Sequence, residues 1–516
     1  MSHQEKLDEL RCRKEKNLSM GGPEKVERQH ARGRLTARER LDLLLDPGTF
    51  LEVGLLDHSD VPGMEEKSPA DSKIAGYGRI DGRRVAVSAN DFTVLAATSS
   101  RVAGKKEGEL KIQAARRGLP LIYLGEAGGA RMPDIMGSTG LASFGGGGLD
   151  SYLQIMSRVR QTPMVTAILG ECYGMPTWMA CLSDFVVQVK GTAMGVSGPR
   201  VVGIALGEEV TDEELGGWQV HAEITGMSDR VADTEEECLG VIRQFLSYLP
   251  SHRDELPPRA DVPENSGEGM EDILDLLPGQ RNRTYDMHRI LRRIADTDSL
   301  FPIKPLFGKS VITALSRVDG HTVGFVANQP LFNGGAMDTD GIDKVMSFLC
   351  LCDTFNIPLV FMHDIPGFLV GRTAERNRVA ARVMNYMNAL GLLTVPRISI
   401  ICRKTYGMAF WNMCGSGCGA DFIVAWPTAE ISFVDPAIAA RVVFGGKDAD
   451  EEQRREFIDG MVRDSSPYGA AGLHYLHDVI EPAKTREYIM DALDICRESR
   501  TRGMSEHRLA NWPTKF

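Results

Sequence analysis

Two short segments share a pattern that suits chemistry on a carbonyl group. Residues 173–178 read Tyr-Gly-Met-Pro-Thr-Trp, and residues 406–411 read Tyr-Gly-Met-Ala-Phe-Trp. Each follows an apolar run and precedes a helix-like segment, so each glycine can form a tight turn that leaves backbone N–H groups unpaired at a helix start. Such donors stabilise a carbonyl oxygen that gains negative charge during a reaction. A plain tight turn, with Met and Trp in the core, is the alternative.

Three other segments are rich in glycine. Residues 125–131 read Gly-Glu-Ala-Gly-Gly-Ala-Arg, which allows a ligand close to the backbone, and Glu126 and Arg131 could pair with each other. Residues 145–148 are four glycines ahead of a predicted helix. Because no Gly-Lys-Ser/Thr follows, they indicate a mobile loop or a close substrate approach rather than nucleotide binding. Residues 415–419 precede a strand, so they fit the dinucleotide fingerprint poorly.

The usual motifs of hydrolytic catalysis are missing from the sequence. There is no Gly-x-Ser-x-Gly elbow, no His-Glu-x-x-His and no convincing cysteine nucleophile. His221 and His363 are isolated, and we expect both to be structural. Asp364 comes after a predicted strand and could act in chemistry or cap a turn; we favour the cap. The missing acid–base pair points to donors that stabilise an enolate, with a base supplied from elsewhere.

The elements that would hold these residues occur twice. In the first half the pattern predicts a helix at 34–45, a hairpin over 77–90, buried strands at 121–124 and 165–169, and a helix at 149–159. In the second half it predicts a hairpin over 311–327, a helix at 341–355, a strand at 358–362, a helix at 374–390 and a strand at 398–402. Alternating strands and helices imply crossover units, so the sequence predicts a duplicated α/β domain.

The domain boundary is expected near the middle of the chain. With 516 residues the chain exceeds the size of a single hydrophobic core. Residues 251–269 contain Pro257, Pro258 and Pro263 among charges and glycine, and show no periodicity, which is typical of a linker. We therefore predict an N-terminal domain over 1–260 and a C-terminal domain over 261–516.

Composition limits the classes of partner. The chain is 43% apolar and 25% charged, and its formal net charge of -11 argues against a nucleic-acid surface. Basic residues at 11–14 and 30–40 could meet phosphates, but a solvated helix face is favoured. The ten cysteines are scattered without zinc-ribbon spacing, which indicates reduced thiols and no metal site. Without a signal peptide or a membrane-spanning run, we expect a cytoplasmic protein that binds no membrane.

Several motifs resemble those of the carboxyltransferase β-subunits of biotin-dependent acyl-CoA carboxylases, which include the propionyl-, acetyl- and methylcrotonyl-CoA enzymes. The resemblance covers nearly the whole chain and rests on specific stretches: 30–41 (His-Ala-Arg-Gly-Arg-Leu-Thr-Ala-Arg-Glu-Arg-Leu), 90–94 (Asn-Asp-Phe-Thr-Val), 128–131 (Gly-Gly-Ala-Arg), 214–217, 327–330, 355–360, 364–368 (Asp-Ile-Pro-Gly-Phe), 394–396, 403–404 and 425–430.

The resemblance implies two crotonase-like domains per chain and a hexamer whose active sites lie between one chain's N-domain and another's C-domain. It implies acyl-CoA on the N-domain and biotin on the C-domain. Biotin, carried on a separate chain, would supply the carboxyl group and take the α-proton, which accounts for the missing base. The oxyanion donors implied are Gly174 with Met175, and Met408 with Ala409. The substrate-binding residues implied are Gly128, Gly129, Ala130, Arg131, Trp178, Phe410 and Trp411.

The chain departs from the family at its two turns. The family usually has Gly-Gly there, whereas this chain has Gly-Met in both, with Trp178 and Trp411 beyond. No Met-Lys pair for biotin attachment and no ATP-grasp domain are evident, so a biotin carrier and a biotin carboxylase are expected on other chains. The alternatives are a biotin-independent crotonase-type acyl-CoA decarboxylase, hydratase or hydrolase, and a structural subunit without activity.

Overall fold

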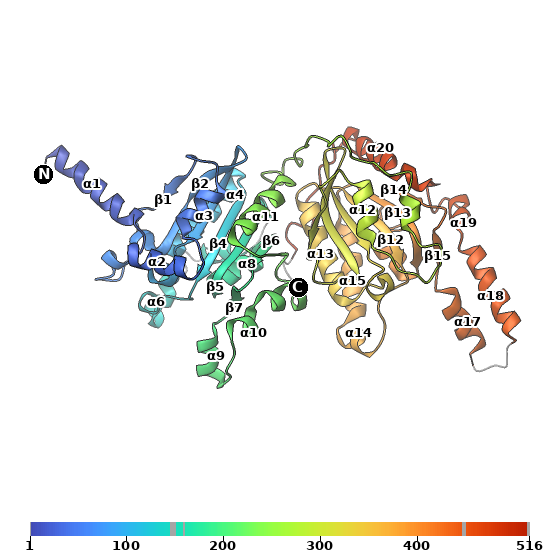
Figure 1. The fold of residues 1–516 in the computed structure, drawn as a ribbon, viewed down its shortest axis with the longest axis horizontal. Coiled ribbons are helices and arrows are strands. Elements are labelled where there is room, and N and C mark those ends of the chain that lie inside the picture. Colours follow the sequence, from blue (N-terminus) through green and yellow to red (C-terminus); the bar gives the residue numbers. More distant parts are fainter. Residues whose placement is uncertain (1, 145–150, 158–159, 446–449, 513–516) are drawn as a thin grey trace. The chain divides into compact units, whose positions relative to one another are not determined.

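The chain forms two compact units. The computed structural model describes residues 2–144, 151–157, 160–445 and 450–512 (Figure 1), and the boundary between the units lies between Ser247 and Tyr248. The predicted linker at 251–269 contains no helix or strand and belongs to unit 2. Among the described residues, no helix combines the length and the apolar character needed to cross a membrane.

Unit 1 is built on one mixed sheet. Its strands are β1 (Leu51–Val53), β2 (Lys73–Ile80), β3 (Arg83–Asn90), β4 (Leu121–Ala127), β5 (Met164–Tyr173), β6 (Phe185–Val189), β7 (Ala193–Gly195) and β8 (Arg230–Ala232). Their order is β1-β2-β3-β4-β5-β6-β8, with β7 paired to β5. The first three strands pair antiparallel, and the others are parallel.

Unit 2 repeats this sheet strand for strand. Its strands are β9 (Phe301–Ile303), β10 (Val311–Val318), β11 (His321–Asn328), β12 (Leu359–Ile365), β13 (Arg397–Tyr406), β14 (Phe422–Ala425), β15 (Glu430–Ser432) and β16 (Asp478–Val479). Their order is β9-β10-β11-β12-β13-β14-β16, with β15 paired to β13. The equal order confirms the duplication and the two α/β domains predicted from the sequence.

Helices cover both faces of each sheet. Those of unit 1 are α1 (His3–Leu18), α2 (Pro23–Ala31), α3 (Ala37–Leu44), α4 (Arg101–Arg117), α5 (Met132–Ile135), α6 (Gly137–Phe144), α7 (Ser151–Met156), α8 (Met175–Leu182), α9 (Pro199–Leu206), α10 (Asp212–Gly216) and α11 (Glu235–Ser247). Those of unit 2 are α12 (Met287–Ile294), α13 (Thr339–Thr354), α14 (Arg372–Arg376), α15 (Val379–Leu392), α16 (Met408–Asn412), α17 (Pro436–Phe444), α18 (Glu451–Asp464), α19 (Pro467–Gly472) and α20 (Thr485–Glu498).

The packing follows the alternation of side chains along the strands. In unit 1, Leu121 and Tyr123 face α4 and α8, while α3 and α11 pack on the other face (Figure 1). In unit 2, Val360 and Met362 belong to the core that α12 and α20 cover. Parallel strands buried on both faces need apolar residues at every position, which explains the continuous apolar runs of the sequence.

Local signals account for the predicted elements and for their errors. Both hairpins form at their Asp-Gly pairs, where Asp81 and Asp319 have positive φ, as a tight two-residue turn requires. The helix predicted at 34–45 starts only at Ala37, because Thr36 forms a capping box with Glu39. The helix predicted at 374–390 is wrong as one element, because left-handed Arg378 separates α14 from α15.

The strands of both units extend further than predicted, and β4, β5, β12 and β13 each run on past the apolar residues into polar ones. Of the helix predicted at 149–159, the described part is α7, and residues 149–150 and 158–159 lie outside the described residues. The glycine run at 145–148 also lies outside them. All ten cysteines lie among the described residues, and none of them forms a disulfide.

Candidate active site

The first Tyr-Gly-Met segment forms the turn from β5 into α8. Gly174 has φ 76° and ψ -115°, a conformation that side-chain-bearing residues avoid, so glycine is required there. Its own N–H donates to the carbonyl of Gly195 at 3.1 Å. The next residue, Met175, is the first of α8, and in the described chain its N–H has no acceptor. The pair implied by the family resemblance therefore offers one unpaired donor, on Met175.

The second segment forms the same turn from β13 into α16. Gly407 has φ 58° and ψ -139°, and its N–H donates to the carbonyl of Ser432 at 3.0 Å. Met408 and Ala409 are the first two residues of α16, and neither N–H has an acceptor in the described part of the chain. These are the two donors implied for the second oxyanion site.

A tyrosine hydroxyl fixes the strand end before each turn. The Tyr173 hydroxyl donates to the carboxylate of Asp212. The Tyr406 hydroxyl donates to Glu430 at 2.6 Å and accepts a hydrogen bond from Arg281 at 2.7 Å. Burial, and then the hydrogen bond to the acid, raise the pKa of both hydroxyls, so each stays a neutral donor that anchors its turn.

Large apolar side chains surround both turns without closing into the core. The exposed fractions are 38% for Trp178, 36% for Met408 and 39% for Trp411. The Phe410 ring packs edge-on against Trp411, with 5.9 Å between ring centroids. The alternative in which these Met and Trp side chains serve only as core is therefore wrong for these three, and they line accessible surface beside the donors.

The Gly128–Gly129–Ala130 loop follows β4, and Arg131 lies beneath it. Arg131 is 4% exposed and hydrogen-bonds to Asp71, to the Ser72 hydroxyl at 3.0 Å and to the Thr98 carbonyl at 3.1 Å. In this arrangement its guanidinium supports the loop, while Gly128 and Ala130 are exposed.

The pairing of Glu126 with Arg131, which the sequence left possible, does not occur: the two side chains have other partners. Glu126 lies within β4 and is fully buried, where it pairs with Arg40 at 2.6 Å and Arg34 at 2.9 Å. Five residues apart on either side of a turn, Glu126 and Arg131 point to different neighbours. The partners of Glu126 come from the N-terminal segment instead.

The expectation that Asp364 caps a turn is also wrong. Asp364 lies inside β12, is 2% exposed, and accepts the backbone N–H of Lys404 at 3.3 Å. Burial raises the pKa of its carboxyl, against the lowering effect of Arg403 at 3.7 Å. Its burial leaves it no access to a ligand.

Both histidines have internal partners, as predicted. His363 is fully buried and hydrogen-bonds to Ser399 at 2.7 Å and Thr405 at 3.2 Å, and burial lowers its pKa to about 3. His221 bonds to the carbonyl of Met194 at 2.9 Å, and burial lowers its pKa. Neither is placed to act as a general base.

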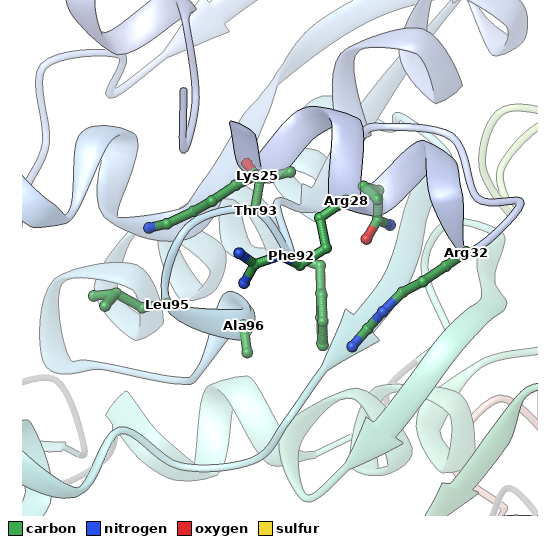
Figure 2. A pocket seen from close by; sticks show the side chains of 8 residues that line it. Lys25, Arg28, Arg32, Phe92, Thr93, Leu95 and Ala96 are labelled. Carbon is green, nitrogen blue, oxygen red and sulfur yellow. The ribbon is translucent and has the colours of Figure 1, made fainter. Parts of the chain in front are cut away.

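A basic pocket in unit 1 was not identified from the sequence. It has a volume of about 240 Å³ and is lined by Lys25, Arg28, Gln29, Arg32, Phe92, Thr93, Leu95 and Ala96. Figure 2 shows Lys25 and Arg28 of α2, and Arg32 just after its end, on the side of the loop that carries Phe92 and Ala96. The Arg32 guanidinium lies 5.3 Å from the centre of the Phe92 ring. Three cations on one wall suit an anionic ligand such as a phosphate.

A signal for this pocket was present in the sequence. Lys25, Arg28 and Arg32 are spaced three and four residues apart, which places them on one face of a helix. What the sequence did not show is that this face meets the Asp-Phe-Thr loop after β3. The contact is fixed by Gly21, whose N–H donates to the Thr93 hydroxyl at 3.0 Å and whose missing side chain lets the two segments touch.

The chain is similar to known proteins over nearly its whole length. Residues 28–509 match the carboxyl transferase domain model. A propionyl-CoA carboxylase carboxyltransferase subunit of Haloferax mediterranei is 36% identical over 97% of this chain and 98% of that protein. The methylmalonyl-CoA decarboxylase subunit alpha of Propionigenium modestum is 34% identical over 96% of both chains.

Solved structures include a transcarboxylase 12S with a TM-score of 0.90 and 32% identity, covering 97% of this chain and 96% of that one. It is a hexamer, crystallised with methylmalonyl-coenzyme A and methylmalonic acid bound. The predicted tandem of crotonase-like units is confirmed by this match over nearly the full length.

Proposed function

This chain belongs to the carboxyl transferase family, and from that premise we propose that unit 1 holds a CoA thioester at the Gly174 turn while unit 2 receives biotin at the Gly407 turn. The family match and the propionyl-CoA carboxylase relative confirm the resemblance inferred from the sequence. The chain is a carboxyltransferase subunit that acts on acyl-CoA. The observation that carries the site assignment is the pair of equivalent turns, which within the described residues are followed by one unpaired backbone donor in unit 1 and two in unit 2.

The chemistry asked of unit 1 is to stabilise an enolate. The Met175 N–H, at the start of α8, can donate to a thioester oxygen as negative charge develops there, and removing one such donor costs about 2.7–4 kcal/mol of transition-state stabilisation in other enzymes. The Tyr173–Asp212 hydrogen bond holds the strand end, so the donor needs no reorganisation during reaction. Trp178 beside it supplies apolar surface for the acyl group.

The basic pocket fits the other end of the same substrate. Coenzyme A carries phosphates at its nucleotide end, and Lys25, Arg28 and Arg32 offer charge-assisted hydrogen bonds to them. The Leu95–Ala97 segment joins this pocket to the loop after β4, because the Gly128 N–H donates to the Ala96 carbonyl at 3.0 Å. Pocket and loop thus belong to one wall of unit 1, which supports the assignment of acyl-CoA to this unit.

The hydrogen-bond donors of the second turn are compatible with biotin. The ureido carbonyl of biotin needs hydrogen-bond donors, and the N–H groups of Met408 and Ala409 have no acceptor among the residues that the structure describes. Biotin supplies the carboxyl group when its carrier chain delivers it. The residues of this chain contribute the donors, the anchoring hydrogen bond between Tyr406 and Glu430, and the apolar side chains of Phe410 and Trp411.

The proposal includes a homo-oligomer with sites shared between chains, and a partner that carries biotin and biotin carboxylase. Equivalent helices of the two units expose apolar side chains: Val201, Ile204 and Leu206 on α9, and Ile438, Val442 and Val443 on α17. Such rows are typical of surfaces covered by a second copy. Light scattering of the purified chain tests for a hexamer, and Ile204→Glu should break it. A cytoplasmic location is part of the same proposal.

The decisive assay supplies a biotin carboxylase, a biotinylated carrier, ATP and labelled bicarbonate, and offers a panel of acyl-CoAs. Label in one or more acyl-CoA products supports the function. Absence of label from every thioester, with carboxylated carrier demonstrably present, overturns it. Gly174→Ala is the informative variant, because its positive φ excludes alanine and the donor at Met175 would move.

A second candidate is a biotin-independent decarboxylase. The observation that favours it is the Met408 side chain, which stands on the turn where the family usually has glycine and is 36% exposed. Release of CO2 from a malonyl-type thioester in the complete absence of biotin would support this activity, whereas strict dependence on biotin would exclude it.

A further inference from the structure

A buried carboxylate links the basic pocket to the first turn. Glu126 lies in β4 at a point where pairing with β5 is irregular: Gly125 pairs with Ile168, but Ala127 pairs with Cys172. One residue of β4 therefore faces three of β5, which is a β-bulge. The extra residues belong to β5, and opposite them the Glu126 side chain points towards the N-terminal segment.

Three side chains from that segment converge on the carboxylate. Gln29 of α2 donates to Glu126 Oε2 at 2.8 Å, Arg40 of α3 reaches the same oxygen at 2.6 Å, and Arg34 donates to Oε1 at 2.9 Å. Gln29 is 4% exposed and Arg40 is 1% exposed. Charge-assisted hydrogen bonds between buried groups favour a single arrangement.

The same helix α2 supplies Lys25 and Arg28 to the basic pocket, and Arg32 follows at its C-terminal end. Gln29 lies one residue from Arg28, and its side chain also lines that pocket. A shift of α2 when phosphates bind would therefore move the donor that Gln29 offers to Glu126. The hydrogen bond from Gln29 to Glu126 directly connects this wall of the pocket with the sheet.

On its other side Glu126 touches the strand that leads to the turn. A side chain at Gly170 would come within 2.5 Å of Glu126 Cγ, so the carboxylate lies against the β5 backbone. Gly174 follows four positions later in the same chain segment. The loop at Gly128 begins two residues after Glu126. Both catalytic loops of unit 1 thus start from the backbone that Glu126 supports.

We propose that Glu126 is a positioning residue, through which the grip of the basic pocket on CoA phosphates sets the geometry of the Met175 donor. This inference rests on the proposed function of unit 1. Binding energy gained at a remote part of a substrate accelerates the reaction only if it orients the reacting centre, so a substrate without that part loses kcat as well as affinity. Glu126 connects the basic pocket with the strand that leads to the Met175 donor.

The test compares two substrates: the acyl-CoA that the wild-type chain carboxylates best, and the pantetheine thioester of the same acyl group, which lacks the nucleotide phosphates. Glu126→Gln keeps the size of the side chain and removes its charge. In this variant kcat for the acyl-CoA should fall at least about tenfold, towards the pantetheine value, while kcat for the pantetheine thioester stays within about threefold. The Kd of free CoA, measured by calorimetry, should change by less than about threefold.

Glu235→Gln is the matched control. Glu235 is 7% exposed and binds Arg40 at 2.7 and 2.8 Å, so its loss disturbs the same buried arginine without touching Gln29. It should lower Tm and leave the ratio of the two kcat values unchanged. Gln29→Met is the second variant, because it removes the hydrogen bond from α2 to Glu126, together with a longer one to the Leu35 carbonyl at 3.3 Å, and leaves both carboxylates in place. It should reduce the preference for acyl-CoA even if Glu126→Gln fails to fold.

The outcomes separate this inference from the proposed function. If the wild-type chain carboxylates acyl-CoA but Glu126→Gln or Gln29→Met slows both substrates by the same factor, Glu126 is only structural and the inference fails. The same holds if Glu235→Gln changes the ratio as strongly. If the wild-type chain carboxylates no thioester, the proposed function itself fails.

Discussion

Glu126 and Asp364 occupy the same position in the two repeated sheets. Each lies at the irregularity between neighbouring parallel strands: the register of β4 with β5 shifts between Gly125 and Ala127, and that of β12 with β13 shifts between His363 and Ile365. Both side chains are buried. Duplication has therefore preserved a buried acid at the bulge, next to the strand that leads into each Tyr-Gly-Met turn.

The two units neutralise this acid in different ways. Glu126 is paired with Arg34 and Arg40 of the N-terminal segment. Asp364 has Arg403 at 3.7 Å, and Arg403 precedes Tyr406 by three residues on β13. The corresponding residue before Tyr173 is Gly170. A glycine is needed in unit 1 because the glutamate fills the space beside it, whereas unit 2 places its own cation there.

Gly170→Ala should destabilise the protein. The added Cβ would lie 2.5 Å from Glu126 Cγ and 2.7 Å from Glu126 Cδ, and overpacking of this kind costs about 1–3 kcal/mol. Urea denaturation should show a lower midpoint with an unchanged m value. Gly240→Ala is the control: it lies in α11 with no atom within 4 Å of an added Cβ, and should be neutral or stabilising by up to about 1 kcal/mol. Equal midpoints for the two variants would contradict the packing argument.

Met408→Gly should open the second turn. The Met408 side chain is 36% exposed beside the donors of Met408 and Ala409, and glycine would restore the pair usual in the family. The rate of carboxyl transfer from a malonyl-type thioester to free biotin should rise about tenfold, equivalent to about 1.4 kcal/mol. Met175→Gly alters the first turn and should leave the dependence on biotin concentration unchanged. If the rate of transfer to free biotin rises in both variants, or in neither, Met408 does not limit the access of biotin.

Prediction from sequence succeeded where the signal was local or repeated. The Asp-Gly hairpins, the buried strands and the two glycine turns follow from short patterns. Because the sequence is duplicated, each pattern occurs twice, which supports its interpretation. The partner of Glu126 could not be predicted in this way. Arg34 lies 92 residues away in the sequence, and no local pattern indicates that Glu126 faces it. Adjacency suggested Arg131 instead, which packs on Asp71.

The basic pocket illustrates the same limit. The spacing of Lys25, Arg28 and Arg32 indicates a cationic helix face, but such faces are usually solvated. Only the contact between Gly21 and Thr93 shows that this face lies over Phe92 and forms a pocket. Predicting it required knowing which loop meets α2.

Arg28→Ala should lower kcat/KM for an acyl-CoA about tenfold, because a hydrogen bond to a charged group contributes about 1.5–3 kcal/mol. The pantetheine thioester of the same acyl group should be unaffected, since it carries no nucleotide phosphate. Raising the salt concentration should lower kcat/KM for the acyl-CoA more in the wild type than in the variant. Arg11→Ala on α1 is the control, because Arg11 is exposed and lies outside the pocket. Loss of activity with both thioesters would mean that Arg28 serves the fold and not the phosphates.

Stability should fall in mild acid because of His363. Burial lowers the pKa of this imidazole from 6.5 to about 3, so the folded state keeps it neutral while the unfolded state binds a proton below about pH 6.5. Between those pH values the unfolded state holds more protons than the folded state. As the pH falls through this range, the free energy of unfolding should decrease by up to about 1.4 kcal/mol per pH unit for this one group.

His363→Gln tests this assignment, because glutamine can hydrogen-bond to Ser399 or Thr405 but does not titrate. The variant is expected to be less stable at pH 7.5, since the imidazole is fully buried and well packed. Its free energy of unfolding should nevertheless depend less steeply on pH between 6 and 4 than that of the wild type, on the order of 1 kcal/mol per pH unit less. Chemical denaturation at several pH values gives both slopes. Parallel slopes would mean that groups other than His363 cause the acid sensitivity.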